Sequence, residues 1–208
     1  PFYYPTHTLF MVLAATGSYA TKVTAMGYED VEDDPVFKKG VNLWDNTISN
    51  AFSLMRLANG GVIRINECRR IGAKAPSSYI SAFYGTKGGY QFSNAQHIFT
   101  QNKGEGVTLE DVSDYVNSMA MTENKDLPDF KQRVANHEWQ WDSFAPIQDY
   151  KRLPKEYEDL KNGHMASHKF LIDDFCRAAY NHTLPTVNAW LAARFTISGI
   201  VAFESVKC

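Results

Sequence analysis

The sequence predicts an α+β fold, a large open, mainly antiparallel β-sheet with helices packed on one face. Two patterns indicate this class. Alternating apolar and polar residues with hairpin turns between them occupy much of the first hundred residues, whereas helical periodicity is concentrated near the two ends of the chain. Successive hairpins pair strands antiparallel, and strands segregated from helices are typical of α+β domains. We expect all 208 residues to form a single domain.

An opening helix is expected over Thr6–Thr16. Pro5 suits the first turn of a helix, residues 9–15 are wholly apolar, and Gly17 can adopt the left-handed conformation that ends a helix. Because the apolar residues surround the axis instead of forming one stripe, we expect this helix to be buried on most sides.

Five or six strands are expected next. Asn59-Gly60-Gly61 favours a tight hairpin turn, and a second hairpin is expected around residues 85–89. The acidic segment 29–40 predicts a loop. The expected strands share alternation and β-branched or aromatic residues, and they cover residues 21–28, 45–57, 62–70, 77–84, 89–94 and 96–101.

The second half of the chain is predicted to be mainly helical. Thr108-Leu-Glu-Asp111 resembles a capping box, so a helix is expected from there to about residue 119. Residues 122–163 predict a long irregular excursion with one short helix. Two further helices are expected over residues 164–180 and 187–206. Their apolar faces are expected to contain Met165, Ile172, Phe175, Cys176 and Ala179 in the first helix and Trp190, Leu191, Ile197, Ile200 and Val201 in the second.

Apolar strand residues do not all fit one face of a sheet. The residues concerned are Phe52, Leu54, Val62, Ile63, Ile65, Tyr79, Phe83 and Tyr84. An apolar sheet face that is left open needs a second cover. We therefore expect a homodimer or homotetramer that forms through the sheet.

Composition and charge argue against several classes of partner. Apolar residues make up 44% and charged residues 21% of the chain, and the net charge is −2 with both signs scattered. A nucleic-acid or membrane-surface protein would instead carry a basic patch or stripe, so we expect neither partner. The longest apolar run is seven residues, far short of the about 20 that span a bilayer. Cys68, Cys176 and Cys208 are odd in number and far apart, which predicts no disulfide framework and favours a cytoplasmic location.

Two motifs that could hold a cofactor or a metal are incomplete. Gly104-Glu-Gly106 imitates a dinucleotide fingerprint, but the third glycine is missing and no βαβ unit surrounds it, so a turn before a capped helix is favoured. His164 and His168 are four residues apart, a spacing that can bind a metal on one helix face. No third ligand lies at an obvious spacing, and no metal site is predicted.

Polar residues crowd the strand that returns from the Asn-Gly-Gly turn. Alternation places Arg64, Asn66 and Cys68 on one face of this strand and Glu67 and Arg69 on the other. The pattern fits a solvated or ligand-facing surface, and it fits ion pairing across strands equally well. Residue types alone leave both interpretations open.

Tyr4 and His7 stand at the start of the first helix. Histidine titrates near neutral pH and can accept or donate a proton, and a nearby tyrosine can share a hydrogen bond with it. From residue types alone, a structural role is the favoured interpretation for this histidine.

Several motifs along the chain resemble one family. They are Tyr4-Pro-Thr-His7, Val41-Asn-Leu-Trp-Asp45, Arg64-Ile-Asn-Glu-x-Arg-Arg-Ile-Gly72, Tyr84-Gly-Thr-x-Gly88, Leu153-Pro through Asn162-Gly-His164, Ser167-His168, Asp173-Asp-Phe175 and Ala189-Trp-x-Ala-Ala-Arg-x-Thr-x-x-Gly-Ile200. Together they resemble the C-terminal domain of the Gfo/Idh/MocA oxidoreductases, the group of glucose–fructose oxidoreductase and inositol dehydrogenase. The resemblance extends over essentially the whole chain.

The resemblance implies a two-domain enzyme. In that family an N-terminal Rossmann domain binds NAD or NADP, and the C-terminal domain supplies most of the substrate pocket and the oligomer interface. We therefore expect this chain to be a fragment that is inactive alone, with the cofactor domain upstream and no cofactor-binding residue of its own. The implied substrate is a sugar, a cyclitol or a related polyol.

The resemblance also implies roles for individual residues. His7 is the catalytic candidate, because a histidine at about this place in the dehydrogenases takes part in proton transfer. The candidate substrate contacts are Tyr4, Thr6, Arg64, His164 and His168.

Two other functions are kept open. The Tyr-Pro-Thr-His pattern also resembles the NAD-dependent glycosidases of the same superfamily, in which Gly and Pro usually follow the histidine, whereas Thr8, Leu9 and Phe10 follow it here. The third hypothesis is a non-catalytic sugar-binding or dimerisation module that keeps the sheet without the catalysis.

Overall fold

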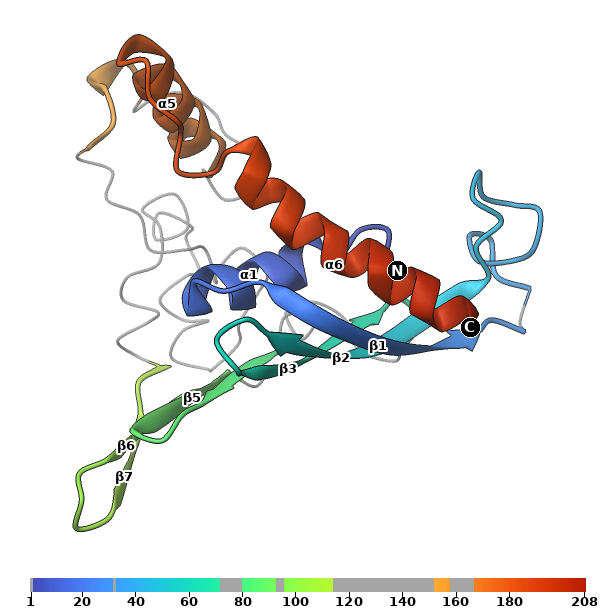
Figure 1. Ribbon diagram of the computed structural model, residues 1–208, viewed down its shortest axis with the longest axis horizontal. Helices are drawn as coiled ribbons and strands as arrows, with labels where there is room; N and C mark the ends of the chain where they lie inside the picture. Colours follow the sequence, from blue (N-terminus) through green and yellow to red (C-terminus); the bar gives the residue numbers. More distant parts are fainter. Residues whose placement is uncertain (1, 32, 72–79, 93–95, 114–151, 158–166) are drawn as a thin grey trace, which may run out of the picture. The chain divides into compact units, whose positions relative to one another are not determined.

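The computed structural model describes residues 2–31, 33–71, 80–92, 96–113, 152–157 and 167–208 (Figure 1). The chain divides into two compact units. The first consists of residues 1–72 and 186–208, and the second consists of residues 73–185.

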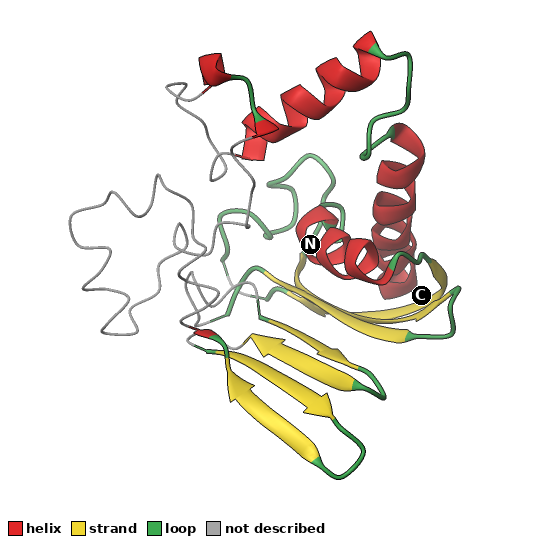
Figure 2. Ribbon diagram, turned by 90° about the vertical axis from the view of Figure 1, so that its left-hand side faces the viewer, coloured by secondary structure: helices red, strands yellow, loops and turns green. Residues whose placement is uncertain are grey.

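The first unit is a three-stranded antiparallel sheet with two helices on one face (Figures 1 and 2). Helix α1 (Thr6–Thr16) precedes β1 (Ala20–Glu29), β2 (Ile48–Leu57) and β3 (Val62–Cys68), and α6 (Ala189–Lys207) returns from the far end of the sequence. The strand order is β1-β2-β3. The predicted α+β class, the antiparallel pairing and the helices on one face are confirmed.

Strand alternation decides which face of this sheet the helices cover. In β2 the odd-numbered residues are buried, whereas Phe52, Leu54 and Arg56 are exposed. In β3 the buried positions include Ile63 and Ile65. The core also contains Leu9, Leu13, Phe195, Ala202 and Phe203 from the two helices. Burying each large apolar side chain contributes roughly 1.5–3 kcal/mol, so this single layer holds the first unit together.

Helix α1 has the predicted bounds, but its burial differs from the prediction. Gly17 ends the helix in the left-handed conformation with φ 62°, as expected. Only one side of α1 is buried, through Leu9 and Leu13, while Phe10 on another side is exposed. The expectation that α1 is buried on most sides was wrong, because the three strands and α6 cover one side of the helix only.

Helix α6 packs closely against the start of α1 and against strand β1. Gly199 packs so closely that an added Cβ would lie 2.1 Å from Pro5 Cγ, and a Cβ on Gly27 of β1 would lie 2.6 Å from Val206 Cγ1. Ser205 Oγ accepts a hydrogen bond from the backbone N–H of Ala25 at 3.0 Å. This close approach requires small side chains at the contact.

The predicted apolar face of α6 was therefore wrong. Trp190, Ile197, Ile200 and Val201 are exposed, and Trp190 is 76% exposed. The buried side of α6 instead holds Phe195, Ser198, Gly199, Ala202 and Phe203. Only Leu191 of the predicted set packs partly against the core.

Helix α6 is also the one helix among the described residues whose length and composition would allow it to cross a membrane. Its Phe195, Ala202 and Phe203 are buried in the core of the first unit. Core helices of globular proteins meet the same criterion, so we interpret α6 as a core helix.

The predicted loop between β1 and β2 is confirmed, and side chains fix its path. Asp34 accepts hydrogen bonds from the backbone N–H groups of Val36 and Phe37 at 2.7 and 2.9 Å. Arg70 pairs with the Asp34 carboxylate, and its guanidinium lies 5.0 Å from the centre of the Phe37 ring. The Arg70 hydrogen bond holds the pKa of Asp34 well below its usual value. Asn42 closes the loop by donating to the carbonyl of Val36 at 2.8 Å.

The second unit contains a separate four-stranded antiparallel sheet, in the order β4-β5-β6-β7. Its elements are β4 (Ser81–Tyr84), β5 (Gly88–Phe92), β6 (His97–Asn102), β7 (Val107–Asp111), the 3-10 helix η4 (Lys155–Tyr157) and α5 (Ser167–Tyr180). The described strands thus number seven in two sheets, where the sequence predicted five or six in one. The hairpin around residues 85–89 is confirmed.

The helix predicted to begin at Thr108 was wrong over Val107–Asp111, which forms β7. Gly104 and Gly106 have φ values of 89° and 158°, and they turn the chain back on itself after β6. The backbone groups of β7 then bond to β6, and this ladder outweighs the local capping signal. The turn interpretation of the two glycines is confirmed. Residues 114–119 of the predicted helix lie outside the described residues.

The described part of α5 also turns a different face inward from the one predicted. Ile172, Phe175 and Cys176 are exposed, whereas Phe170 and Asp173 are buried. Asp173 accepts two hydrogen bonds from the Arg177 guanidinium, at 3.0 and 2.8 Å. Arg152 lies 4.8 Å from the centre of the Phe170 ring. These pairings let a carboxylate occupy the buried side, so the apolar pattern alone pointed to the wrong face. Ala179 is likewise exposed, and Met165 lies outside the described residues.

Candidate functional site

Tyr4 and His7 form a polar pair at the start of α1. Tyr4 Oη lies 3.3 Å from His7 Nε2, and the two rings meet edge to face with centroids 5.5 Å apart. Both side chains are exposed, as is Thr6 beside them. The helix begins here because Pro5 occupies the N-cap position and its carbonyl accepts the N–H of Leu9 at 2.9 Å. The structure therefore brings Tyr4 and His7 together, and Thr6 is exposed next to His7 in the sequence.

A buried carboxyl group lies beneath this pair. Glu67 of β3 is only 5% exposed. Its Oε1 accepts a short hydrogen bond from the Thr8 hydroxyl, and its Oε2 accepts one from Arg69 Nη2 at 2.9 Å. Arg69 Nη2 also lies 3.5 Å from the carbonyl oxygen of Tyr4. Two points thus tie the start of α1 to the end of β3, Thr8 to Glu67 and Tyr4 to Arg69, the residue that follows β3.

Opposing effects act on the Glu67 carboxyl. Burial raises its pKa, because the charged form loses its hydration. The Thr8 hydrogen bond and the positive charges of Arg69 and His7 partly offset this shift. Of the exposed pair, His7 contributes the smallest of these effects on the pKa of the carboxyl.

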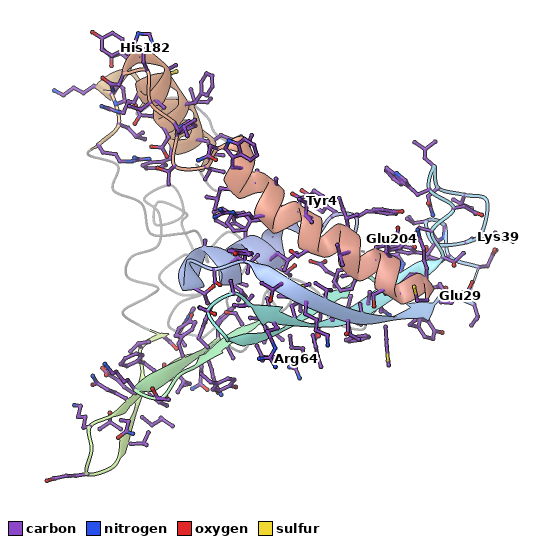
Figure 3. The ribbon with its side chains drawn as sticks, in the orientation of Figure 1. Tyr4, Glu29, Lys39, Arg64, His182 and Glu204 are labelled. Carbon is purple, nitrogen blue, oxygen red and sulfur yellow. The ribbon has the colours of Figure 1, made fainter. Side chains whose placement is uncertain are left out.

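Arg64 lies on the other side of the sheet from the Tyr4–His7 pair (Figure 3). Side chains alternate along β3, so Glu67 points to the helix-covered face and Arg64 points to the open face. Arg64 stands opposite Leu54 in the ladder. The resemblance implied Arg64 as a substrate contact, and within the first unit the structure places it on the sheet face opposite to the Tyr4–His7 pair.

The remaining predicted substrate contacts belong to the second unit. His168 is exposed on α5, and His164 lies outside the described residues. Over the residues that the structure describes, no group of three or more His, Cys, Asp or Glu side chains is placed to hold a metal ion. The roles suggested for His164 and His168 stay predictions.

Sequence reasoning noted Glu67 and Arg69 but missed their link to α1. It placed both on one strand face, and in the structure they form an ion pair, with Arg69 one residue past the end of β3. The partner that completes the site, Thr8, is 59 positions from Glu67. The available signal was that Thr8 falls in the first turn of a helix whose N-terminus has no acidic residue of its own.

Comparisons with known proteins reveal the fold. No protein-family model matches this sequence, and a search of curated proteins finds no match. Solved structures of oxidoreductases do match over nearly the whole chain. An oxidoreductase domain protein from Kribbella flavida is 13% identical with a TM-score of 0.60, and the alignment covers 98% of this chain and 47% of that one.

Two sugar dehydrogenases give similar values. A levoglucosan dehydrogenase, solved in complex with NADH and L-sorbose, is 15% identical with a TM-score of 0.57 and 98% and 47% coverage of the two chains. UDP-N-acetylglucosamine 3-dehydrogenase from Acidithiobacillus ferrooxidans is 15% identical with a TM-score of 0.55, and 97% and 45% of the two chains are covered.

These matches define a class at the level of fold. The chain has the fold of a part of Gfo/Idh/MocA-type oxidoreductases, and it spans less than half the length of the solved neighbours. The predicted resemblance is confirmed at this level. Sequence identities of 13–15% support a shared fold and do not establish a shared activity.

Proposed function

We propose that this chain is the single substrate-binding and oligomerisation domain of an NAD(P)-dependent oxidoreductase that acts on a sugar, a cyclitol or a related polyol. The observation that carries the proposal is the exposed Tyr4–His7 pair, on a fold shared with sugar dehydrogenases. Two of those neighbours are named for sugar oxidation, and one was solved with NADH. The part of the neighbours that this chain does not cover leaves room for a cofactor domain.

The proposed mechanism uses the first turn of α1. His7 takes up or returns the proton of the reacting hydroxyl, and Tyr4 and Thr6 contact the substrate from the same turn. The Tyr4 hydroxyl, 3.3 Å from His7 Nε2, orients the imidazole. Hydride acceptance or donation is the chemistry that a bound nicotinamide supplies.

The residues described here do not fit a dinucleotide site. The glycines at 104 and 106 belong to a β-hairpin, and the residues directly after them form strand β7 instead of a helix N-terminus that could receive a pyrophosphate. Binding of NAD or NADP is therefore assigned mainly to the separate Rossmann domain, and this chain alone is expected neither to bind NAD tightly nor to turn over.

The open face of the first sheet supports the proposed homodimer or homotetramer. Met26 is 76% and Leu54 57% exposed on this face, and Phe52 and Val62 are exposed beside them. Within the first unit the helices cover only the opposite face, and a second copy is the cover that the proposal gives to this apolar surface.

Turnover by the full-length protein tests the proposal. Panels of sugars, cyclitols and polyols are offered with NAD and with NADP, and nicotinamide reduction is followed by absorbance. The proposal expects reduction with at least one polyol. Release of free sugar from an aryl glycoside without net NADH would instead support the glycosidase alternative. Absence of both reactions, together with absence of nicotinamide binding, would support the non-catalytic module.

A further inference from the structure

His7 lies in the chain between Tyr4 and Thr8, and these two residues are bonded to Arg69 and Glu67 at the end of β3. On one side, the carbonyl of Tyr4 lies 3.5 Å from Arg69 Nη2. On the other side, the Thr8 hydroxyl donates to the Glu67 carboxyl. Arg69 and Glu67 are themselves joined at 2.9 Å. The bonds therefore close a ring through Tyr4, Arg69, Glu67 and Thr8, with His7 in the chain between its two ends.

The first turn of α1 needs support of this kind. The N-cap is Pro5, which offers no side-chain hydrogen bond to the helix, and the first turn contains no acidic residue. The N–H groups at a helix start lack partners within the helix and give that end a partial positive charge. An acidic group at this end is stabilising. Glu67 supplies it from β3, across the core, instead of from the helix itself.

The position of Glu67 is costly for a purely structural residue. Ile63 and Ile65 precede it on the same face of β3 and close the core with apolar side chains. A buried ionisable pair is often no more stabilising than apolar residues of similar size. The Glu67 carboxyl is therefore better explained by its bonds to the start of α1, where Tyr4 and His7 lie.

We propose that Glu67 and Arg69 are positioning residues that hold the first turn of α1, through the Thr8 hydroxyl and the Tyr4 carbonyl, so that His7 and Tyr4 keep their mutual geometry. The effect on turnover rests on the proposed function, since the geometry matters for catalysis if His7 exchanges protons. The effect on the environment of His7 does not depend on it.

Thr8 offers a matched pair of variants in the full-length protein. Thr8→Val removes the hydroxyl with little change in shape, and Thr8→Ser keeps the hydroxyl. Glu67→Gln is a second disrupting variant. Glu204→Gln, a carboxyl-to-amide change on the exposed side of α6, is the control. Two readouts are compared, steady-state kinetics and the rate at which diethyl pyrocarbonate modifies His7, with exposed His182 as the internal reference by mass spectrometry.

The proposal expects Thr8→Val and Glu67→Gln to lower kcat about tenfold with KM nearly unchanged, which is the loss expected from about one hydrogen bond. Both should change the modification rate of His7 relative to His182, and Thr8→Ser should restore both readouts. An unchanged His7 rate in Thr8→Val would overturn the proposal, with or without turnover. If no polyol is turned over but the His7 rate responds as expected, the positioning role stands and the proposed function fails. If Glu67→Gln does not fold, the Thr8 pair decides.

Discussion

Gly199 of α6 lies against the Pro5 ring, so close that a Cβ at this position would fall 2.1 Å from Pro5 Cγ and 2.9 Å from the carbonyl oxygen of Phe2. A helix from the far end of the sequence thus packs against Phe2 and Pro5, which flank Tyr3 and the candidate substrate contact Tyr4. This contact fixes the entry of the chain into α1.

Gly199→Ala is expected to destabilise the first unit. The methyl group would meet Pro5 and backbone rather than a flexible side chain, so α1 or α6 must shift, at a cost of about 1–3 kcal/mol. Urea unfolding followed by circular dichroism measures the loss. Ile197→Ala on the exposed side of α6 is the control, and it is expected to change stability by only about 0.5 kcal/mol. Equal effects of the two changes would contradict the close contact.

Stability is expected to fall on mild acidification because of His97. This side chain is buried, stacks on Phe92 with ring centroids 4.4 Å apart, and has Nδ1 2.6 Å from Tyr90 Oη. Burial lowers its pKa, and the charge of Asp111 partly opposes the shift. The unfolded chain then binds a proton more readily than the folded one. The contribution of neutral His97 to the free energy of unfolding is therefore fully present above the unfolded-state pKa of about 6.5. This contribution is lost as the pH falls below that value.

Thermal or urea unfolding between about pH 7.5 and about pH 5.5 measures this effect, with a slope of at most about 1.4 kcal/mol per pH unit. His97→Gln removes the titrating group and should flatten the profile. The exposed His182 provides the control variant His182→Asn, in which the profile should be unchanged. A parallel slope in His97→Gln would show that another group is responsible.

The open face of the first sheet is expected to form the interface between the copies of the oligomer. Phe52→Lys should dissociate it, because the face already holds Lys22, Arg56 and Arg64 and a fourth cation would repel a second copy. Sedimentation equilibrium measures the mass. Leu43→Lys, at an exposed position in the loop between β1 and β2, is the control and should leave the mass unchanged. A monomeric wild-type protein, or an oligomer that survives Phe52→Lys, would contradict an interface on this face.

Local patterns predicted the elements of the first unit well. Pro5 and Gly17 gave α1 its correct ends, and Asn59-Gly60-Gly61 gave the β2–β3 hairpin, because each residue acts through its own backbone preferences. Alternation in β2 and β3 also separated Glu67 from Arg64 correctly. These features need no knowledge of the rest of the chain.

Features set by tertiary packing could not be predicted in this way. The inward face of α6 depends on how closely Gly199 approaches Pro5, and β7 depends on pairing with β6 in place of its own helix signal. The Thr8–Glu67 hydrogen bond joins segments that only the fold brings together. The Tyr4–His7 pair could be predicted from the sequence, whereas the contacts of Glu67 and Arg69 that hold it could not.

The most direct test of the account is the turnover of His7→Gln in the full-length protein. Glutamine can still bond to Tyr4 but cannot exchange protons near neutral pH. If His7 is the proton-transfer residue, kcat should fall by about 10²–10⁴-fold while the unfolding midpoint stays close to that of the wild type. A variant that retains kcat within about twofold of the wild type would contradict the assignment of His7 and, with it, the functional reading of the first turn of α1.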